Sequence, residues 1–299
     1  MIISLPASLG IGEKLSRILG LEHINVDYKV FPDGESYVRF PIDVKGKEII
    51  LIQTTYPDQD KKFVELLLAI DAAVSYGASS ISAVIPYMAY ARQDRAFIEG
   101  EAVSIRALLR ALRSAGLDRI YVIDIHKEDS LRHFSGSAYN IDPVPLFAKV
   151  LQDKLSKPIV VAPDLGAEKK AKSLAKLLNT DFVVIKKYRD RRTGEVRHEL
   201  PDVLDVHERD AVIVDDIIST GGTVAKIAKH LKSLNTRKVF VIASHGLFVR
   251  DALEKLRSSG VDQIYVLKTV GISIRDEYVS VLDPTELIAN KIRETLFSK

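Results

Sequence analysis

Short apolar runs rich in β-branched residues alternate along this chain with amphipathic stretches. The runs occupy residues 48–53, 81–87, 119–125, 158–163, 210–216, 238–244 and 263–269. Runs that are apolar throughout are typical of parallel strands buried on both faces of a sheet. Between them, apolar residues recur three or four positions apart, as in the sets Phe63, Leu66, Leu67, Ile70, Val74 and Val224, Ile227, Ala228, Leu231. This spacing is that of a helix with one buried face. The chain is therefore predicted to be an α/β protein with mainly parallel sheets flanked by helices.

The two halves of the chain resemble each other in sequence order. Four segments pair in succession: 2–10 with 160–166, 26–35 with 180–189, 48–55 with 211–218, and 118–124 with 262–268. One such match could arise by chance between apolar strands, but four in the same order favour an internal duplication. We therefore expect one domain at 1–142, a second at 143–283, and a C-terminal helix at 284–299 with Pro284 in its first turn.

Composition excludes several classes of protein. The 299 residues include no cysteine, which rules out a disulfide framework, thiolate zinc sites, iron–sulfur clusters and a cysteine nucleophile. The net charge of +3 gives no support to a nucleic-acid or membrane partner. No apolar run approaches the roughly 18 residues of a membrane span, and no basic region followed by an apolar stretch opens the sequence. We expect a cytoplasmic protein in which any metal is bound by oxygen or imidazole.

The strongest functional pattern lies at 212–231, where a strand is followed by two acids, a Ser-Thr-Gly-Gly-Thr turn and a helix. Consecutive glycines allow a tight turn whose N–H groups, hydroxyls and helix N-terminus converge on one anion, such as a phosphate. Carboxylates suit ribose hydroxyls or a hydrated cation instead. A capped helix explains a bare Gly-Gly-Thr but not the whole string. The string predicts a sugar-phosphate site made of Asp215, Asp216, Ser219, Thr220, Gly221, Gly222 and Thr223. The matching segment of the first half, 53–62, lacks this pattern.

This string resembles the phosphoribosyl-binding loop of the type I phosphoribosyltransferase fold. With the segments 31–35, 86–95, 124–134, 163–171 and 186–196, the chain over essentially its full length resembles the ribose-phosphate pyrophosphokinase family, also called phosphoribosyl pyrophosphate synthases. The resemblance implies two tandem phosphoribosyltransferase-like domains. It implies an enzyme that transfers the β,γ-diphosphoryl group of Mg–ATP to the 1-hydroxyl of ribose 5-phosphate, giving phosphoribosyl pyrophosphate and AMP. It also implies a homo-oligomer, a dimer or larger, with an ATP site shared between subunits.

Several polar segments have functions that the residues alone leave open. Residues 31–35 form an ordinary Pro-Asp-Gly turn, a solvated loop would also explain the charges at 92–95, and a lone histidine after a strand is more often structural. The resemblance assigns these segments to ATP through Phe31, Asp33, Gly34, Glu35, Arg92, Gln93, Asp94 and His126. Phe31 stacks on adenine in this assignment, and residues 33–35 contact the base from the neighbouring subunit.

The resemblance also implies a magnesium cofactor held by His126 and Asp164. Magnesium keeps several waters and prefers few protein ligands, so two residues from separate loops are enough.

The basic segment 186–200 has a Thr-Gly turn between alternating arms and predicts a projecting hairpin. A solvated surface flap would have the same composition. The resemblance makes this segment the catalytic arm, with Lys187 and Arg189 as catalytic residues, although Lys186 lies one residue away and leaves the register open.

The phosphate loop departs from the family in one position, because Ser219 stands where an aspartate is common. Serine still offers a hydroxyl, so we expect the activity to be retained with altered local contacts. Two alternatives share the fold: a phosphoribosyltransferase, which would need no ATP site or second half, and a catalytically silent regulator, which would show degenerate ATP and lysine motifs.

Overall fold

In the computed structural model, contacts between residues divide the chain into two compact units. The first unit comprises Met1–Asp142, Lys268–Ile272 and Asp283–Lys299, and the second comprises Pro143–Leu267 and Ser273–Leu282. The structure describes all residues except 190–195, 200–204 and 298–299. The sequence predicts a second domain that is one continuous segment, 143–283. In the structure, Lys268–Ile272 belongs to the first unit instead.

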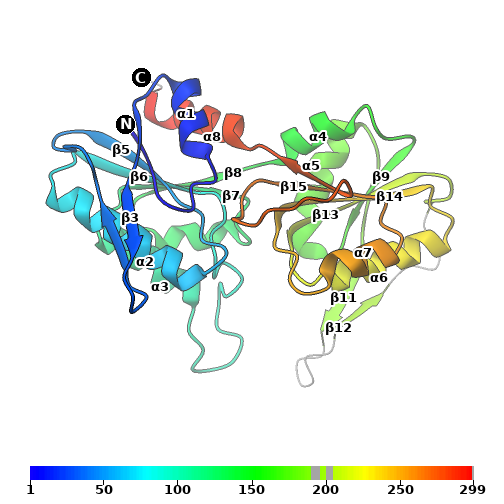
Figure 1. Cartoon of the computed structure of the whole chain (residues 1–299). Helices are drawn as coiled ribbons and strands as arrows, with labels where there is room; N and C mark the ends of the chain where they lie inside the picture. The colour runs from blue at the N-terminus through cyan, green and yellow to red at the C-terminus, as the bar shows by residue number, and fades with distance from the viewer. Residues whose placement is uncertain (190–195, 200–204, 298–299) are drawn as a thin grey trace. The chain divides into compact units, whose positions relative to one another are not determined.

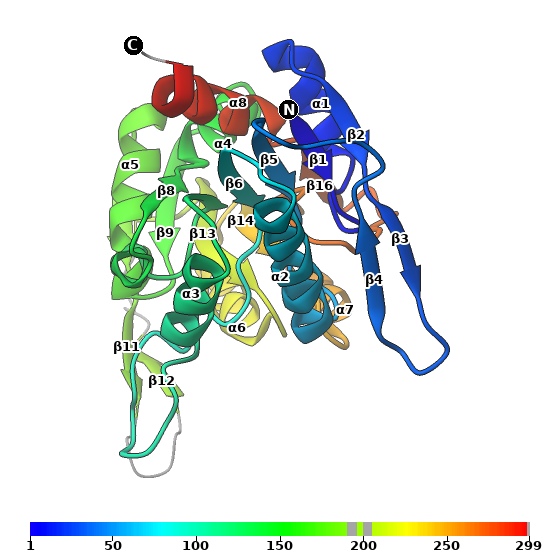
Figure 2. The same ribbon diagram turned by 90° about the vertical axis from the view of Figure 1, so that its left-hand side faces the viewer.

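The first unit is built on a six-stranded parallel sheet with the order β2-β1-β5-β6-β7-β8. Its strands are β1 (Ile2–Ser4), β2 (His23–Asn25), β5 (Glu48–Ile52), β6 (Ser80–Ile85), β7 (Arg119–Ile123) and β8 (Ser137–Ile141). Its helices are α1 (Ile11–Leu19), α2 (Gln59–Ser75), α3 (Ser104–Ser114), the 3-10 helix η1 (Glu128–His133), α8 (Thr285–Ile292) and the π-helical turn η3 (Arg293–Phe297). The hairpin of β3 (Asp27–Val30) and β4 (Ser36–Arg39) forms a separate two-stranded sheet. Figure 2 shows this hairpin beside α2, with its tip projecting away from the main sheet.

The second unit repeats this plan with the order β10-β9-β13-β14-β15-β16, again parallel throughout. Figure 1 labels four of these strands, β9, β13, β14 and β15. Its strands are β9 (Pro158–Ala162), β10 (Phe182–Val184), β13 (Asp210–Ile218), β14 (Lys238–Gly246), β15 (Gln263–Leu267) and β16 (Val279–Leu282). Its helices are α4 (Val144–Leu151), the 3-10 helix η2 (Leu165–Ala167), α5 (Glu168–Leu178), α6 (Gly222–Ser233) and α7 (Ala252–Ser258). A second separate hairpin joins β11 (Lys186–Arg189) to β12 (Val196–Glu199).

Alternation of side chains along each apolar strand explains why helices are needed on both faces. In β5, Ile49 and Leu51 belong to a buried cluster with residues of α2 and α3. The intervening Ile50 and Ile52 are also buried, and successive strand residues point to opposite faces. The α/β class with helix-flanked parallel sheets is therefore confirmed, and each of the seven predicted strands is present.

The shared strand order agrees with the predicted internal duplication and corrects one of its four segment pairs. Pairing 26–35 with 180–189 places β3 opposite β10. In the structure β3 follows the edge strand β2 and forms a hairpin, as β11 follows the edge strand β10. The equivalent of β3 is therefore β11. The sequence match paired β3 with β10 instead, because short apolar strands resemble one another wherever they lie in a sheet.

Helix predictions hold with one exception among the named positions. Val74 was placed on the buried face of its helix, but its side chain is 48% exposed. It lies in the last turn of α2, beside Gly116. Pro284 directly precedes α8, as expected for the closing helix, and α8 packs against α1 in the first unit. No helix in the described part of the chain combines the length and the apolar character needed to cross a bilayer.

Candidate functional site

The predicted phosphate loop is a tight turn between β13 and α6. Gly221 has a φ of 70°, in the left-handed region, and α6 begins at the next residue. A Cβ atom at Gly221 would lie 3.1 Å from the Leu256 Cγ and 3.4 Å from the Ala252 carbonyl oxygen, both in α7. Backbone conformation and space therefore both favour glycine at this position.

Neighbouring segments hold the carbonyl side of this turn. The N–H of Leu247 donates to the Ile218 oxygen at 2.9 Å, and that of Val249 donates to the Ser219 oxygen at 3.0 Å. The Lys255 Nζ donates to the Thr220 oxygen at 3.2 Å. The amides in the first turn of a helix lack acceptors within that helix, and they carry its positive dipole end. Residues 219–223 thus form one turn that leads into a helix N-terminus, the arrangement that suits an oxyanion.

The acid pair occupies a specific place on β13. This strand pairs with β9 only as far as Ile213, but with β14 as far as Ile218. Asp215 and Asp216 therefore lie beyond the last residue paired with β9, at the carboxyl edge where parallel sheets bind ligands. Both side chains are half-buried.

The two carboxyl groups influence each other strongly. Burial, the charge of Asp216 and a hydrogen bond with it raise the pKa of Asp215 well above its usual range, while Lys170 acts in the opposite direction. The N–H of Asp216 also donates to the Asp215 Oδ1 at 2.9 Å. Lys170, on α5, was not among the predicted site residues, although it lies within the quoted segment 163–171. The sequence alone did not indicate that the charge of Lys170 acts on the pKa of Asp215; this follows from the fold.

Asp164 lies at the same edge of the second sheet. It follows β9, the neighbour of β13, and its Oδ1 accepts a hydrogen bond from the Gly166 N–H at 2.8 Å. The described residues contain no group of three or more His, Asp or Glu that could hold a metal ion. A magnesium ion here would therefore need mostly water and phosphate oxygens, which is its usual preference.

Two of the predicted ATP segments follow neighbouring strands in the first unit. Arg92, Gln93 and Asp94 lie in the loop after β6, and the exposed His126 follows β7. Parallel pairing places both segments at the carboxyl edge of this sheet. The side-chain amide of Gln93 donates to the Arg95 oxygen at 3.1 Å and to Glu101 at 3.4 Å, so part of Gln93 holds the loop itself.

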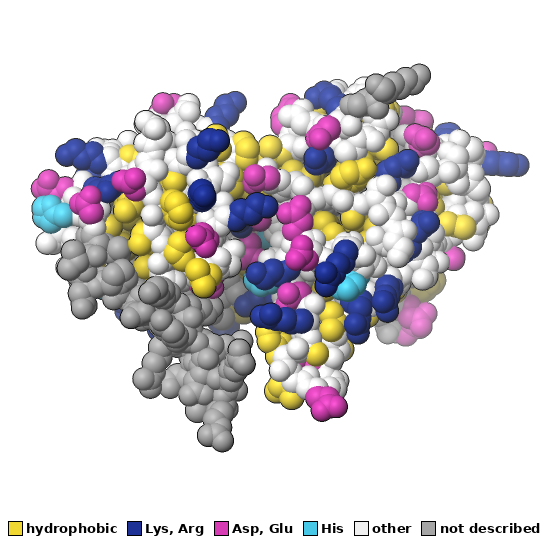
Figure 3. Space-filling model, turned by 180° about the vertical axis from the view of Figure 1, so that it is seen from behind, with side chains coloured by type: hydrophobic (Ala, Val, Ile, Leu, Met, Phe, Trp, Pro, Cys, Tyr) yellow, Lys and Arg dark blue, Asp and Glu magenta, His cyan; other side chains and the backbone are white. Residues whose placement is uncertain are grey.

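A basic surface lies close to this loop. Figure 3 shows Lys, Arg and His side chains gathered around the base of the loop that precedes α3. Partial burial and then the charges of Arg132, Arg106 and Arg110 lower the pKa of His133. Several cations close together favour a polyanionic ligand.

The remaining residues that the sequence predicts to bind ATP form the tip of the β3–β4 hairpin. The N–H of Phe31 donates to the Glu35 oxygen at 2.8 Å, and that of Glu35 donates to the Asp33 Oδ1 at 3.2 Å. Gly34 has a φ of 99°. Phe31 is 39% exposed as a residue, and its ring meets Tyr37 edge-on, with the Lys29 Nζ 4.7 Å from the ring centre. The tip is thus an ordered turn that presents an aromatic ring to solvent.

The first unit has no equivalent of the phosphate loop after β5. Asp58, an acid with a φ of 60°, occupies the N-cap of α2 in place of the glycine that precedes α6. The hydroxyl of Thr54 donates to the Thr269 oxygen, and the N–H of Gly271 donates to the Tyr56 oxygen at 2.8 Å. A carboxylate at this helix end and a packed chain segment both disfavour an anion there.

The predicted catalytic arm is present as the paired strands β11 and β12, with Lys187 opposite His198 and Arg189 opposite Val196. The side chains of Lys187 and Arg189, and residues 190–195 between the strands, lie outside the part that the structure describes.

Comparison with known proteins places this geometry in a family. Residues 1–116 match the family model of the N-terminal domain of ribose phosphate pyrophosphokinase, and residues 145–279 match that of the phosphoribosyl transferase domain. A ribose-phosphate pyrophosphokinase of Sulfurisphaera tokodaii is 44% identical over 98% of this chain and 100% of its own length. The chain belongs to the ribose-phosphate pyrophosphokinase family.

Two further relatives support this assignment. A ribose-phosphate pyrophosphokinase of Pyrococcus abyssi is 43% identical over 91% of this chain and 92% of its own length. The crystal structure of phosphoribosylpyrophosphate synthetase from Mycobacterium smegmatis matches with a TM-score of 0.89 and 27% identity, covering 99% of this chain and 98% of that one. The predicted family, enzyme class and phosphoribosyl pyrophosphate synthesis are confirmed. The phosphoribosyltransferase and silent-regulator alternatives are not favoured, because this pyrophosphokinase family is matched across both halves.

We predict that Gly221→Ala lowers the free energy of unfolding by about 1–3 kcal/mol, since alanine is strained at a positive φ. Gly222→Ala is the matched control, because a Cβ there meets no atom within 4 Å. It should be neutral or stabilise the chain by up to about 1 kcal/mol. Denaturant unfolding of both variants tests this, and equal effects would contradict the glycine argument.

Asp215→Asn should stabilise the protein increasingly as the pH rises from 4 towards 8. The native pKa of Asp215 is raised, so the wild-type chain takes up a proton on folding and loses stability as the pH climbs through this interval. Each unit of pKa elevation corresponds to about 1.4 kcal/mol. Thermal unfolding midpoints of both proteins from pH 4 to pH 8 measure the difference.

The control for this series is Asp251→Asn. Its hydrogen bond with Lys255 lowers the pKa of the exposed Asp251, so the stability that the ionised group contributes is lost only below about pH 4, and the difference between Asp251→Asn and the wild type should hardly change from pH 5 to pH 8. A stability gain from Asp215→Asn that did not change with pH would show that the native pKa is not raised.

Proposed function

We propose that the chain transfers the β,γ-diphosphoryl group of Mg–ATP to the 1-hydroxyl of ribose 5-phosphate. The sugar oxygen attacks the β-phosphorus, the bond between that phosphorus and the oxygen bridging to the α-phosphorus breaks, and AMP leaves as phosphoribosyl pyrophosphate forms. The hydroxyl proton passes to solvent. The observation that carries the proposal is the glycine turn at 219–223 beside an acid pair, in a chain that belongs to this family.

The second unit would bind ribose 5-phosphate. The helix N-terminus and the hydroxyl-bearing turn suit the 5-phosphate, which Ser219, Thr220, Gly221, Gly222 and Thr223 would hold. Asp215 and Asp216 would accept hydrogen bonds from the ribose hydroxyls. Because a substrate hydroxyl can donate to an ionised carboxylate, sugar binding would favour the loss of the proton that the pair retains at low pH.

ATP would be bound by the first unit together with a neighbouring subunit. Arg92, Gln93 and Asp94 would contact the nucleotide, and a guanidinium fork suits triphosphate oxygens. Phe31 would stack on adenine, with Asp33, Gly34 and Glu35 against the base from the neighbouring subunit. This sharing requires a homo-oligomer. The exposure of the Phe31 ring at an ordered hairpin tip supports its role.

His126 and Asp164 would hold magnesium, directly or through water. When bound there, magnesium would supply positive charge that offsets the charge of the phosphate groups. Lys187 and Arg189 would neutralise the charge that builds on the transferred group, since such chemistry depends on positioning and electrostatic stabilisation. The cytoplasmic location expected from the sequence is part of this proposal, because both substrates are phosphorylated metabolites.

Incubation of the purified chain with ATP, magnesium chloride and ribose 5-phosphate should yield AMP and phosphoribosyl pyrophosphate in equal amounts. Omission of the sugar phosphate, or chelation of magnesium, should abolish both products. A chain that released ADP, or no nucleotide product at all, would contradict the proposed reaction.

Lys187→Ala should lower turnover by at least about a hundredfold, because a cation that contacts the group in transfer acts mainly in the transition state. Ribose 5-phosphate affinity, measured by calorimetry, should be nearly unchanged. Lys186→Ala is the matched control and should retain most of the turnover. The reverse result would assign the catalytic role to Lys186. Near-normal turnover in both variants would show that neither lysine of this hairpin is catalytic.

A further inference from the structure

A fully buried carboxylate lies in the middle of α2. The side chain of Glu65 is 0% exposed, and that of its ion-pair partner Lys62 is 15% exposed. Burial of a carboxylate is costly unless the group is both paired and hydrogen-bonded. An apolar side chain of similar volume would often stabilise a core equally well or better. The polar contacts of Glu65 therefore call for an explanation beyond stability.

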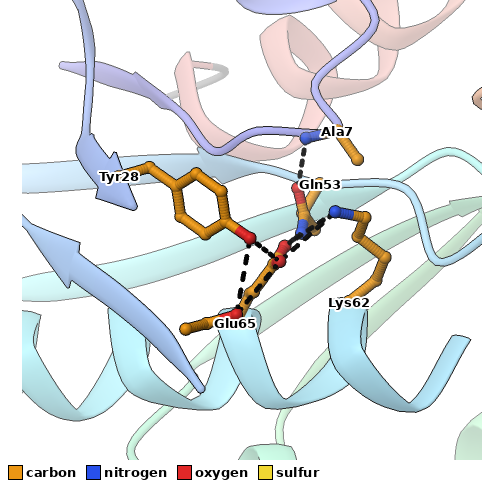
Figure 4. Close-up of polar contacts among 6 residues, drawn as sticks. Ala7, Tyr28, Gln53, Lys62 and Glu65 are labelled. Atoms are coloured by element: carbon orange, nitrogen blue, oxygen red, sulfur yellow. Dashed lines mark hydrogen bonds and ion pairs between the residues drawn. The ribbon is translucent and has the colours of Figure 1, made fainter. Parts of the chain in front are cut away.

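Both strands of the β3–β4 hairpin bind this carboxylate (Figure 4). The Tyr28 hydroxyl donates to the Glu65 Oε1 at 2.7 Å, and the Ser36 hydroxyl donates to the same atom at 3.4 Å. Lys62 contacts both carboxylate oxygens, at 3.3 and 3.2 Å. Tyr28 lies three residues before Phe31, and Ser36 directly follows Glu35. The carboxylate thus holds the hairpin at the base of the 31–35 turn.

The other carboxylate oxygen connects to the edge of the main sheet. The Gln53 Nε2 donates to the Glu65 Oε2 at 2.7 Å, and the Gln53 Oε1 accepts from the Ala7 N–H at 2.9 Å. Gln53 directly follows β5, and Ala7 lies in the loop after β1. The buried Gln53 amide, in the orientation these contacts assign, thereby joins the carboxylate to the carboxyl edge of the first sheet.

The hairpin needs such a connection because it shares no strand pairing with the main sheet. An isolated two-stranded hairpin is only marginally stable in water. Partly buried apolar residues such as Val38 and Phe40 pack its base against the core, but apolar contacts are not directional. Hydrogen bonds to a buried carboxylate are directional, so they set the orientation of the hairpin.

We propose that Glu65 is a positioning residue for ATP binding. It fixes the orientation of the hairpin that carries Phe31 relative to the carboxyl edge of the sheet in the same unit. Tyr28 and Gln53 are its two directional partners. The proposal rests on the proposed function, in which the 31–35 turn contacts adenine. Loss of the connection should weaken ATP binding while leaving chemistry and sugar-phosphate binding intact.

The decisive variant is Tyr28→Phe, which removes one hydroxyl and keeps the ring, because Glu65→Gln carries a greater risk of misfolding. The KM for ATP should rise about fivefold, because the lost hydrogen bond loosens the hairpin and only part of its free energy is passed on to ATP binding. The kcat and the KM for ribose 5-phosphate should stay within about twofold. Calorimetric titration with ATP supplies the same affinity ratio without turnover.

Tyr121→Phe is the matched control. Tyr121 is fully buried in the same unit, and its hydroxyl lies 2.8 Å from that of Thr295. This variant also loses one tyrosine hydrogen bond, but it should leave the ATP affinity unchanged. An equal loss of ATP affinity in both variants would show that general destabilisation causes the loss, and it would overturn the proposal.

A double variant separates positioning from a direct effect on ATP. Phe31→Ala alone should weaken ATP binding, and addition of Tyr28→Phe should then weaken it by clearly less than fivefold, because the ring is gone and only residues 33–35 of the turn remain to be positioned. Effects that multiply, or a Tyr28→Phe variant with wild-type ATP affinity, would overturn the role of Glu65. If Phe31→Ala binds ATP normally, the hairpin is not part of the ATP site, and the positioning role falls with it. Product formation by the wild-type chain tests the proposed reaction separately.

Discussion

Parallel pairing of the central strands is the constraint on which the functional part of each unit depends. Parallel strands end at the same edge of a sheet, and the loops that follow them therefore gather there. In the second unit this brings Asp164 to the same edge as Asp215, Asp216 and the 219–223 turn. In the first unit it does the same for the loop after β6 and for His126. Residues far apart in the chain are thereby brought to one edge of a sheet.

Duplication of this plan left two similar scaffolds with different chemistry. After β13, a glycine with a positive φ turns the chain into α6, and the helix N-terminus there is an arrangement that suits an anion. After β5, an aspartate stands at the N-cap of α2, and a chain segment from 268–272 packs beside the loop. Both units also carry a hairpin outside the main sheet after the edge strand, β3–β4 in one and β11–β12 in the other. The hairpin of the first unit is held to its scaffold by hydrogen bonds to a buried carboxylate.

Local sequence was informative where the function is local. The string 212–231 contains its strand, acids, turn and helix in one stretch, so the predicted turn could be placed residue by residue. Apolar runs gave the central strands for the same reason. The prediction failed where similar strands had to be told apart, as for β3 and β10, and where a helix face had to be extended to its last turn, as at Val74. Periodicity records which side of a helix is apolar, but not where the surface beneath it ends.

The sequence by itself determined the α/β class, the repeat, the family and the glycine turn between β13 and α6, because these depend on residues adjacent in the chain or on patterns that recur along it. Only the tertiary structure decided that Glu65 is buried among hydroxyl, amide and ammonium donors, that Lys170 acts on Asp215, and that 268–272 joins the first unit. Apart from the pair of Lys62 and Glu65 on one helix, these contacts bring together groups that are separated in sequence. Their free energies depend on burial and distance, which a chain acquires only when it folds.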